Sequence, residues 1–225
     1  MLYIFGYKRE AVEVIKAHGK LLRQFAHDCQ NNEGKRDYFL KSYAILMEAC
    51  NIGNEMWSSV QAMQSYTDLI NVSLPIQREL AECKLDVVDL LLDMLEMHLN
   101  EISELNEANL SKDPILKAVS TYINVDTSSS SSSSQNDAEL KWRRLLAQLP
   151  ELVAANLNCC FNFSLKIKYL KAQTLYLTGK SFRLLSQLKY QTRKLNPNGG
   201  DSGGNGDDET ELNIHKAITA WSSLI

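Results

Sequence analysis

The chain has 225 residues and a formal net charge of −3; 44% of its residues are hydrophobic and 23% are charged. This composition is typical of a globular protein with a real core, and it excludes a chain that is disordered or fibrous over most of its length. Only 4 prolines and 10 glycines are present, and six of them lie between positions 197 and 206, so we expect long helices elsewhere.

The cysteine content and the N-terminal residues indicate the compartment. Five cysteines are present, an odd number without the spacing of a disulfide framework. The first residues lack the apolar stretch of a signal peptide, and no window reaches the roughly 18 apolar residues of a membrane span. We therefore expect an intracellular protein, cytoplasmic or nuclear, without membrane insertion.

Hydrophobic residues at helical spacing predict three helices at the start of the chain, over residues 10–29, about 35–50 and about 55–72. Asn and Gly residues interrupt this pattern at positions 31–34 and 51–54, where we place turns. Such short connections predict antiparallel helical hairpins.

The strongest predicted helix follows Pro75, with Ser73 as its expected N-cap, and extends to about residue 110. Its acids are spaced by three and four residues, which places six carboxylates on one narrow stripe of a helix that is otherwise apolar. We expect this helix to be packed on two or three sides, with the acidic stripe wet along one edge. The stripe consists of Glu79, Glu82, Asp86, Asp89, Asp93 and Glu96.

Further helices are predicted at 114–123, 139–149, 151–177 and 181–195, with a break at Gly179. A Ser-rich segment (126–137) and a Gly/Asp-rich segment (196–211) bury too little apolar surface to order and should be flexible. The predicted organisation is an acidic helical block (1–125), the Ser-rich insertion, a basic block (138–195), the linker and an amphipathic C-terminal helix (212–225). The fold class is all-α, a helical bundle or a short superhelical array of helix hairpins, with about seven to nine helices.

The segment from Tyr169 to Asn198 resembles a tetratricopeptide-type helical hairpin. Its matching features are the small Ala172 on the first helix, Gly179 at the tight turn, and the exit Leu195-Asn-Pro-Asn198. Residues 2–11 resemble the end of one such helix, a turn at Gly6 and the start of the next helix. The resemblance implies a curved stack of helix pairs whose concave face binds a peptide or a partner subunit.

Charge is segregated along the chain. Residues 79–113 contain ten acids and two bases, whereas residues 138–195 contain eleven bases and two acids. The basic segment is a candidate partner-binding surface, and its basic residues are Lys141, Arg143, Arg144, Lys166, Lys168, Lys171, Lys180, Arg183, Lys189, Arg193 and Lys194.

Three interpretations of this asymmetry remain open. The basic segment docks on the acidic helix within the chain or its oligomer, or it binds an acidic partner protein. In the third interpretation it binds nucleic acid, because aromatic residues that could stack on bases are interleaved with the basic residues. These aromatic residues are Trp142, Tyr169, Tyr176 and Tyr190.

No pattern for catalysis, a cofactor or a metal is found. Cys159 and Cys160 are adjacent, which is unfavourable for chelating one metal, and we expect buried structural thiols. His18 and His27 are predicted on opposite faces of one helix, which excludes a joint role. His98 can pair with Glu101 one turn further on.

The sequence therefore predicts a non-catalytic helical scaffold or adaptor that binds partner proteins within a larger complex. The alternative is a nucleic-acid-associated subunit that uses the basic block over residues 138–195.

Overall fold

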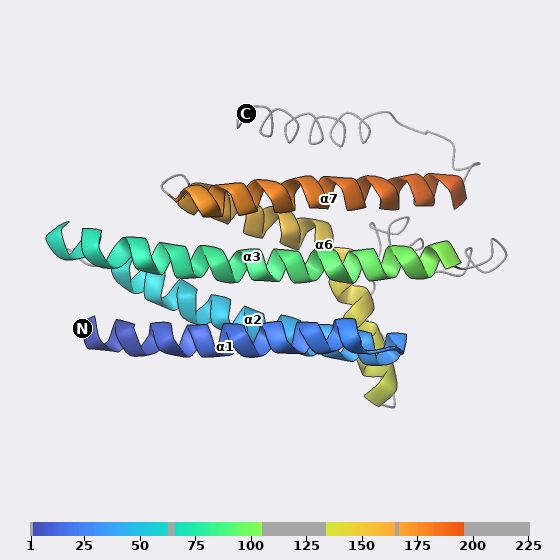
Figure 1. Cartoon of the computed structure of the whole chain (residues 1–225), viewed down its shortest axis with the longest axis horizontal. Helices are drawn as coiled ribbons and strands as arrows, with labels where there is room; N and C mark the ends of the chain where they lie inside the picture. The colour runs from blue at the N-terminus through green and yellow to red at the C-terminus, as the bar shows by residue number, and fades with distance from the viewer. Residues whose placement is uncertain (1, 63–65, 105–133, 165–166, 196–225) are drawn as a thin grey trace, which may run out of the picture. The chain divides into compact units, whose positions relative to one another are not determined.

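The structure, a computed structural model, describes residues 2–62, 66–104, 134–164 and 167–195. It is all-α, as predicted, and no strand occurs in these ranges (Figure 1). The described helices are α1 (Leu2–Asp28), α2 (Asn32–Gln61), α3 (Tyr66–Glu104), α6 (Ser134–Ser164) and α7 (Lys168–Leu195). Each has at least 27 residues, which confirms the expectation of long helices.

The chain divides into two compact units. Unit 1 comprises Met1–Leu91 and Glu151–Thr174, and unit 2 comprises Leu92–Pro150 and Leu175–Ile225. Helices α3, α6 and α7 contribute residues to both units, so each unit draws on both the predicted acidic block and the predicted basic block.

In unit 1, α1 and α2 form the predicted antiparallel hairpin. Asn31 has an extended backbone and caps α2, because its side chain accepts a hydrogen bond from the Gly34 N–H. Gly19 allows the two helices to approach closely, since a Cβ at this position would lie 2.7 Å from Leu46 Cγ. The buried Ser42 hydroxyl donates a hydrogen bond to the Gly19 carbonyl at 2.7 Å, which fixes the register of the hairpin.

The core of unit 1 lies around the first part of α3. From Leu80 to Leu91 most side chains are fully buried, so this part of the helix is packed on most of its circumference. Side chains of α6 pack here as well. The Cys160 thiol donates a hydrogen bond to the Ala81 carbonyl of α3, and the Phe163 ring packs edge-on against Trp57 of α2. Unit 2 has its own core, which includes Met94, Trp142, Leu149, Leu177 and Leu184.

Three of the predicted turns at glycines were wrong. Helix α2 continues through residues 51–54, α7 through Gly179 and α1 through Gly6. At Gly53 the reason is packing rather than chain reversal, because a Cβ there would lie 3.1 Å from the buried Leu80 Cδ1 on α3. The hairpin turn expected at Gly179 is therefore not formed, while the tetratricopeptide resemblance as a family assignment stays a prediction.

The predicted helix start at Pro75 and the break at Pro150 were also wrong, since α3 and α6 both continue through their prolines. Each proline removes one backbone donor from its helix. A buried apolar residue lies next to each proline, Ile76 after Pro75 and Leu149 before Pro150. Residues 134–137, expected in the flexible Ser-rich segment, belong to α6. The predicted helix 114–123, the remainder of the Ser-rich segment, the linker 196–211 and the C-terminal helix 212–225 lie outside the described residues.

Candidate functional site

The acidic stripe of α3 is the predicted site that the structure describes most fully. Its first four acids belong to unit 1 and its last two to unit 2. The stripe was expected to be wet, and this was wrong for half of it: Glu79, Asp86 and Asp93 are buried, whereas Glu82, Asp89 and Glu96 keep part of their surface in solvent. The buried and partly exposed acids alternate because steps of three and of four residues turn in opposite directions around the helix, by about 60° and about 40°.

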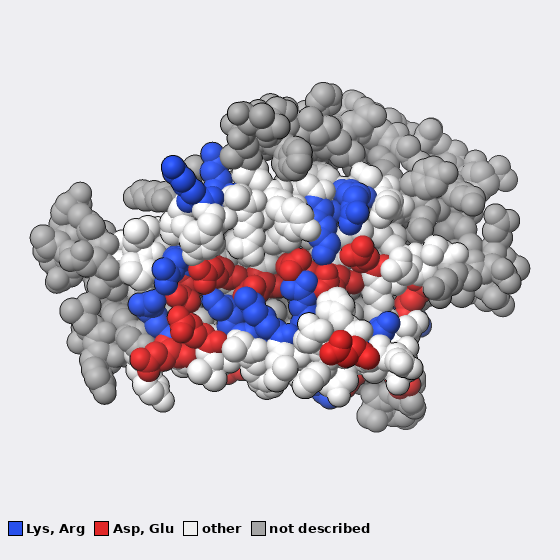
Figure 2. Space-filling model, viewed as in Figure 1, with Lys and Arg blue, Asp and Glu red and all other residues white. Residues whose placement is uncertain are grey.

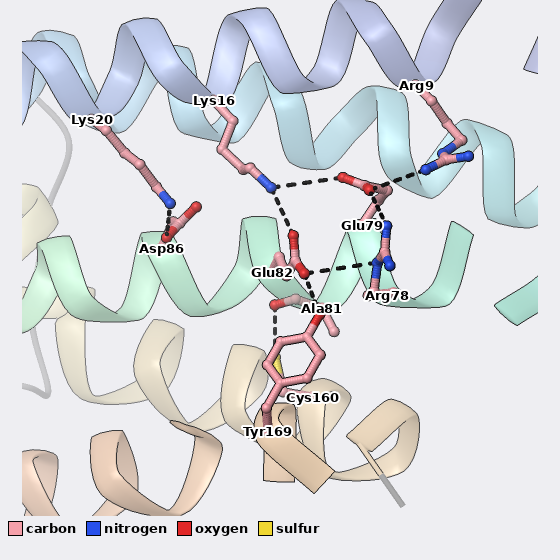
Figure 3. A network of polar contacts seen from close by, with 10 residues as sticks. All are labelled: Arg9, Lys16, Lys20, Arg78, Glu79, Ala81, Glu82, Asp86, Cys160 and Tyr169. Carbon is pink, nitrogen blue, oxygen red and sulfur yellow. Dashed lines mark hydrogen bonds and ion pairs between the residues drawn. The ribbon is translucent and has the colours of Figure 1, made fainter. Parts of the chain in front are cut away.

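In unit 1 the stripe is paired with basic residues of α1, not with the predicted basic block. Arg9 reaches Glu79 at 3.4 Å, Lys16 reaches Glu82 at 2.9 Å, and Lys20 reaches Asp86 at 2.9 Å (Figure 3). Arg23 and Asp89 complete the series with a contact of 2.6 Å. Figure 2 shows the result, with basic and acidic side chains adjoining along the line where α1 and α3 meet.

The spacing of the basic residues in α1 is a sequence signal for their pairing with the acidic stripe, although the net charge of the segment does not reveal it. Arg9, Lys16 and Arg23 recur every seven residues, which places them on one side of α1. A seven-residue repeat of bases matches the three-plus-four spacing of the acids on α3, so the two helices can pair charge for charge along their length.

Glu79 is the centre of a buried charge cluster (Figure 3). It contacts Arg9, Lys16 at 3.7 Å and Arg78 at 3.3 Å, and its side chain is 2% exposed. One carboxylate thus faces three cations in a site with little water, where removing the carboxylate would leave buried positive charge uncompensated. The cluster is a structural anchor for the N-terminal half of α1.

Glu82 extends this cluster towards α7. It accepts hydrogen bonds from Lys16 and from the Tyr169 hydroxyl. Burial alone would raise the pKa of Glu82, but these two hydrogen bonds and the charges of Lys16 and Arg78 outweigh it and hold the pKa below the ordinary value. Burial and the bond to Glu82 in turn raise the pKa of Tyr169 to about 12, so the phenol stays a hydrogen-bond donor.

Lys16 and Asp86 respond to burial in different ways. For Lys16, desolvation favours the neutral amine, yet the hydrogen bond to Glu82 and the charges of Glu82 and Glu79 prevail and raise its pKa. For Asp86, desolvation prevails over the attraction of Lys20 and raises the pKa of the carboxyl. Among the described residues, the buried Oδ2 of Asp86 has no hydrogen-bond partner, which accounts for this incomplete compensation.

In unit 2 the stripe does meet the predicted basic block. Lys180 of α7 contacts Asp93 at 3.0 Å and Glu96 at 3.9 Å, and Arg183 contacts Glu96 at 3.9 Å. The interpretation that acidic and basic segments pair within the chain therefore holds for these two bases. Lys180 and Arg183 are engaged in the fold, which reduces the charge they can offer to a partner.

The other candidate basic residues are distributed over two helices. On α6, Lys141, Arg143 and Arg144 are exposed, and Arg143 pairs with Glu139 one turn away at 2.8 Å. On α7, Lys168 and Lys171 are exposed. The side chains of four further candidates lie outside the described set, and these are Lys166, Lys189, Arg193 and Lys194. Of the interleaved aromatic residues, Trp142 is core, whereas Tyr169 and Tyr176 are exposed.

A second surface, not predicted from the sequence, lies on the side of α1 turned away from its packed residues. Large apolar side chains are exposed there: Tyr7 at 73%, Val14 at 70%, Leu21 at 51% and Phe25 at 45%. The Phe25 ring also contacts Tyr38 of α2, with the ring centroids 5.9 Å apart. At about 100° per residue these four apolar residues share one face of the helix, together with the exposed His18. We call these five residues the outer stripe. The face of α1 packed in unit 1 instead carries Val12, Gly19 and Ala26, all buried.

The described residues contain no group of three or more His, Cys, Asp or Glu side chains arranged to hold a metal. All five cysteines are free. Cys50 and Cys83 are buried neighbours: a hydrogen bond between the two thiols lowers the pKa of Cys50 and raises that of Cys83. Burial raises the pKa of Cys160 to about 12, so the thiol stays protonated.

The predicted pairing of His98 is present, with Nδ1 3.8 Å from Glu101 Oε2. His18 and His27 are both exposed, and His27 packs edge-on against Phe39 of α2.

No family model and no solved structure matches the chain. Within the part of the chain that the structure describes, no helix is long and apolar enough to cross a membrane.

Proposed function

We propose that the chain is a non-catalytic helical scaffold that binds partner proteins within a larger complex. The observation that carries the proposal is the outer stripe of α1, where four large apolar side chains stand in solvent on one face of a helix. Scattered exposed apolar residues are ordinary, but an aligned row along a helix is typical of a protein-binding surface. An intracellular location, cytoplasmic or nuclear, belongs to the proposal and rests on the odd number of free cysteines.

The charge pairing supports this choice of surface over the predicted basic face. Lys180 and Arg183 contact acids of α3, and Arg143 contacts Glu139, so three of the candidate bases already have partners in the fold. Exposed apolar area also contributes more to protein binding than solvated charge, which mainly steers the encounter.

The test is affinity capture of the tagged full chain from cells, with wild type compared against Leu21→Glu. Stoichiometric co-purifying proteins that are lost with Leu21→Glu support the proposal. The matched control is Asn51→Glu, which adds the same charge at an exposed position of α2 and should retain the partners. Equal recovery from wild type and Leu21→Glu would reject the outer stripe as the binding surface.

One observation favours the alternative of nucleic-acid binding. Lys168 and Lys171 are exposed on α7 and lie three residues apart, on one face of the helix, an arrangement that suits contact with a nucleic-acid backbone. Fluorescence anisotropy with a single-stranded oligonucleotide tests it. Binding that weakens steeply as salt increases, and that is lost with Lys168→Ala and Lys171→Ala, would support the alternative; no anisotropy change at low salt would eliminate it.

A further inference from the structure

The side chains of the outer stripe are arranged symmetrically about position 16 of α1. One aromatic residue lies nine positions before this point and one lies nine positions after it. With the adjoining half-buried Ala11 included, further residues of this face lie five positions and two positions on either side of position 16. The symmetric pairs are Tyr7 with Phe25, Ala11 with Leu21, and Val14 with His18.

A two-fold interface joins one patch to the same patch of a second copy, so that residue i meets residue j and residue j meets residue i. In an antiparallel pair of α1 helices centred on position 16, the two members of each pair lie level with each other across the interface. Aromatic rings then meet at both ends, and Leu21 faces the small Ala11 of the second copy, so large and small side chains alternate as helix packing favours.

The charges beside the outer stripe favour the antiparallel orientation. The stripe itself contains no Lys, Arg, Asp or Glu, but the exposed Glu10 and Asp28 border it. In a parallel pair each of these acids would lie level with its own copy, which is repulsive. In the antiparallel pair the two copies of Glu10 are separated by roughly 18 Å along the axis, and Glu10 instead lies near the amide of Gln24 in the second copy.

We propose that the partner of the outer stripe is a second copy of this chain, bound through antiparallel packing of the two α1 helices. The inference rests on the proposed function, since it names the partner of the same surface.

The first test is sedimentation equilibrium of the purified full chain at concentrations up to about 100 µM, where an interface of micromolar affinity is occupied. We expect a two-fold higher molar mass for wild type than for Leu21→Glu and Val14→Glu, and a wild-type mass for Asn51→Glu. Circular dichroism of each variant verifies that the exposed substitutions leave the helices intact. A dimer that survives both stripe variants would overturn the inference.

The second test fixes the orientation by cysteine cross-linking in a Cys29→Ser background. Positions 7 and 25 are roughly 27 Å apart within one α1, so they cannot form a disulfide in the same chain. Oxidation by a low-molecular-weight disulfide should join Tyr7→Cys of one chain to Phe25→Cys of the other in the double variant, with two thiols oxidised per bond formed and the reagent reduced. Neither single variant should cross-link. Cross-linking by Phe25→Cys alone would show parallel packing and overturn the inference.

The two proposals fail in different ways. A wild-type chain that is monomeric throughout the concentration series overturns self-association, yet the proposed function survives if cellular capture still yields Leu21-dependent partners. If the chain is monomeric and cellular capture yields no Leu21-dependent partner, both proposals are rejected.

Discussion

The two sides of α1 differ in a way that reverses the usual arrangement of an amphipathic helix. The side towards α3 carries Arg9, Lys16 and Arg23, whose charges are compensated by acids of α3. The opposite side carries the outer stripe, whose apolar groups are exposed. Hydrophobicity alone would have buried the second side and left the first in water.

The difference teaches that α1 is oriented by pairing and by close approach, not by its largest apolar residues. Its contact with α2 uses the small or branched residues Val12, Gly19 and Ala26, and its contact with α3 uses charge. Tyr7, Val14 and Leu21 are thereby left for an external surface, and Phe25 keeps part of its ring exposed beside Tyr38 of α2.

The largest expected effect comes from removing the centre of the charged side. Glu79→Gln leaves Arg9 and Lys16 without their shared carboxylate in a buried site, and we expect a loss of about 3 kcal/mol in the free energy of unfolding. Urea denaturation followed by circular dichroism measures it. The control is Glu55→Gln, which removes the exposed ion pair with Lys8 and should cost less than about 1 kcal/mol. Equal losses for the two variants would contradict a special role of the buried cluster.

A smaller effect is expected at the close approach of α1 and α2. Gly19→Ala places a methyl group 2.7 Å from Leu46, which is fully buried and has little room to move, so we expect a net loss of about 1–2 kcal/mol despite the better helix propensity of alanine. Gly53→Ala is the matched control, since its nearest contact is 3.1 Å and smaller adjustments suffice. Chemical denaturation measures the loss in the free energy of unfolding for both variants. A greater loss for Gly53→Ala would show that the contact between α1 and α2 at Gly19 is not the tighter of the two.

The smallest expected effects on stability distinguish Glu82 from Asp86, two successive acids of the acidic stripe. The pKa of Glu82 is lowered in the folded protein, so its contribution to stability is present at neutral pH and is lost as the pH falls through that pKa. The pKa of Asp86 is raised, so its charged form costs stability above that pKa, and the cost disappears as the pH falls.

We therefore expect Glu82→Gln to lower stability at pH 7 by about 1 kcal/mol, and Asp86→Asn to leave it unchanged or raise it. The gain from Asp86→Asn should vanish below about pH 4, where the ordinary aspartate also becomes protonated. Thermal unfolding between pH 3 and pH 7 measures both variants. A loss of stability with Asp86→Asn at pH 7 that equals the loss with Glu82→Gln would show that the Lys20 pair fully compensates burial.

The all-α class and the apolar surroundings of the acidic stripe followed from the sequence, because the hydrophobic spacing of residues 80–99 admits only a deeply packed helix. The sequence did not predict that the helices continue through Gly53, Pro75 and Gly179. A glycine that relieves a clash with Leu80 and a glycine that reverses the chain look the same without knowledge of the neighbouring helix.

The basic partners of the acidic stripe of α3 were not predicted, for a related reason. Charge summed over long segments singles out the strongly basic block, whereas α1 contains five bases and three acids and therefore has only a small net charge. Only the seven-residue repeat of Arg9, Lys16 and Arg23 identifies these partners. The exposure of Val14 and Leu21 was likewise hidden, since apolar residues at helical spacing predict a helix but not which of two apolar faces is covered.

The buried thiol of Cys83 allows local opening of unit 1 to be measured by chemical labelling. Cys83 is fully buried and the pKa of its thiol is raised, so an alkylating reagent can reach a reactive thiolate only when α2 and α3 separate. Cys29, at the turn between α1 and α2, keeps part of its surface in solvent. The contrast between these two positions turns slow chemical labelling into a measure of how often the hairpin parts from the rest of the unit, independently of any partner.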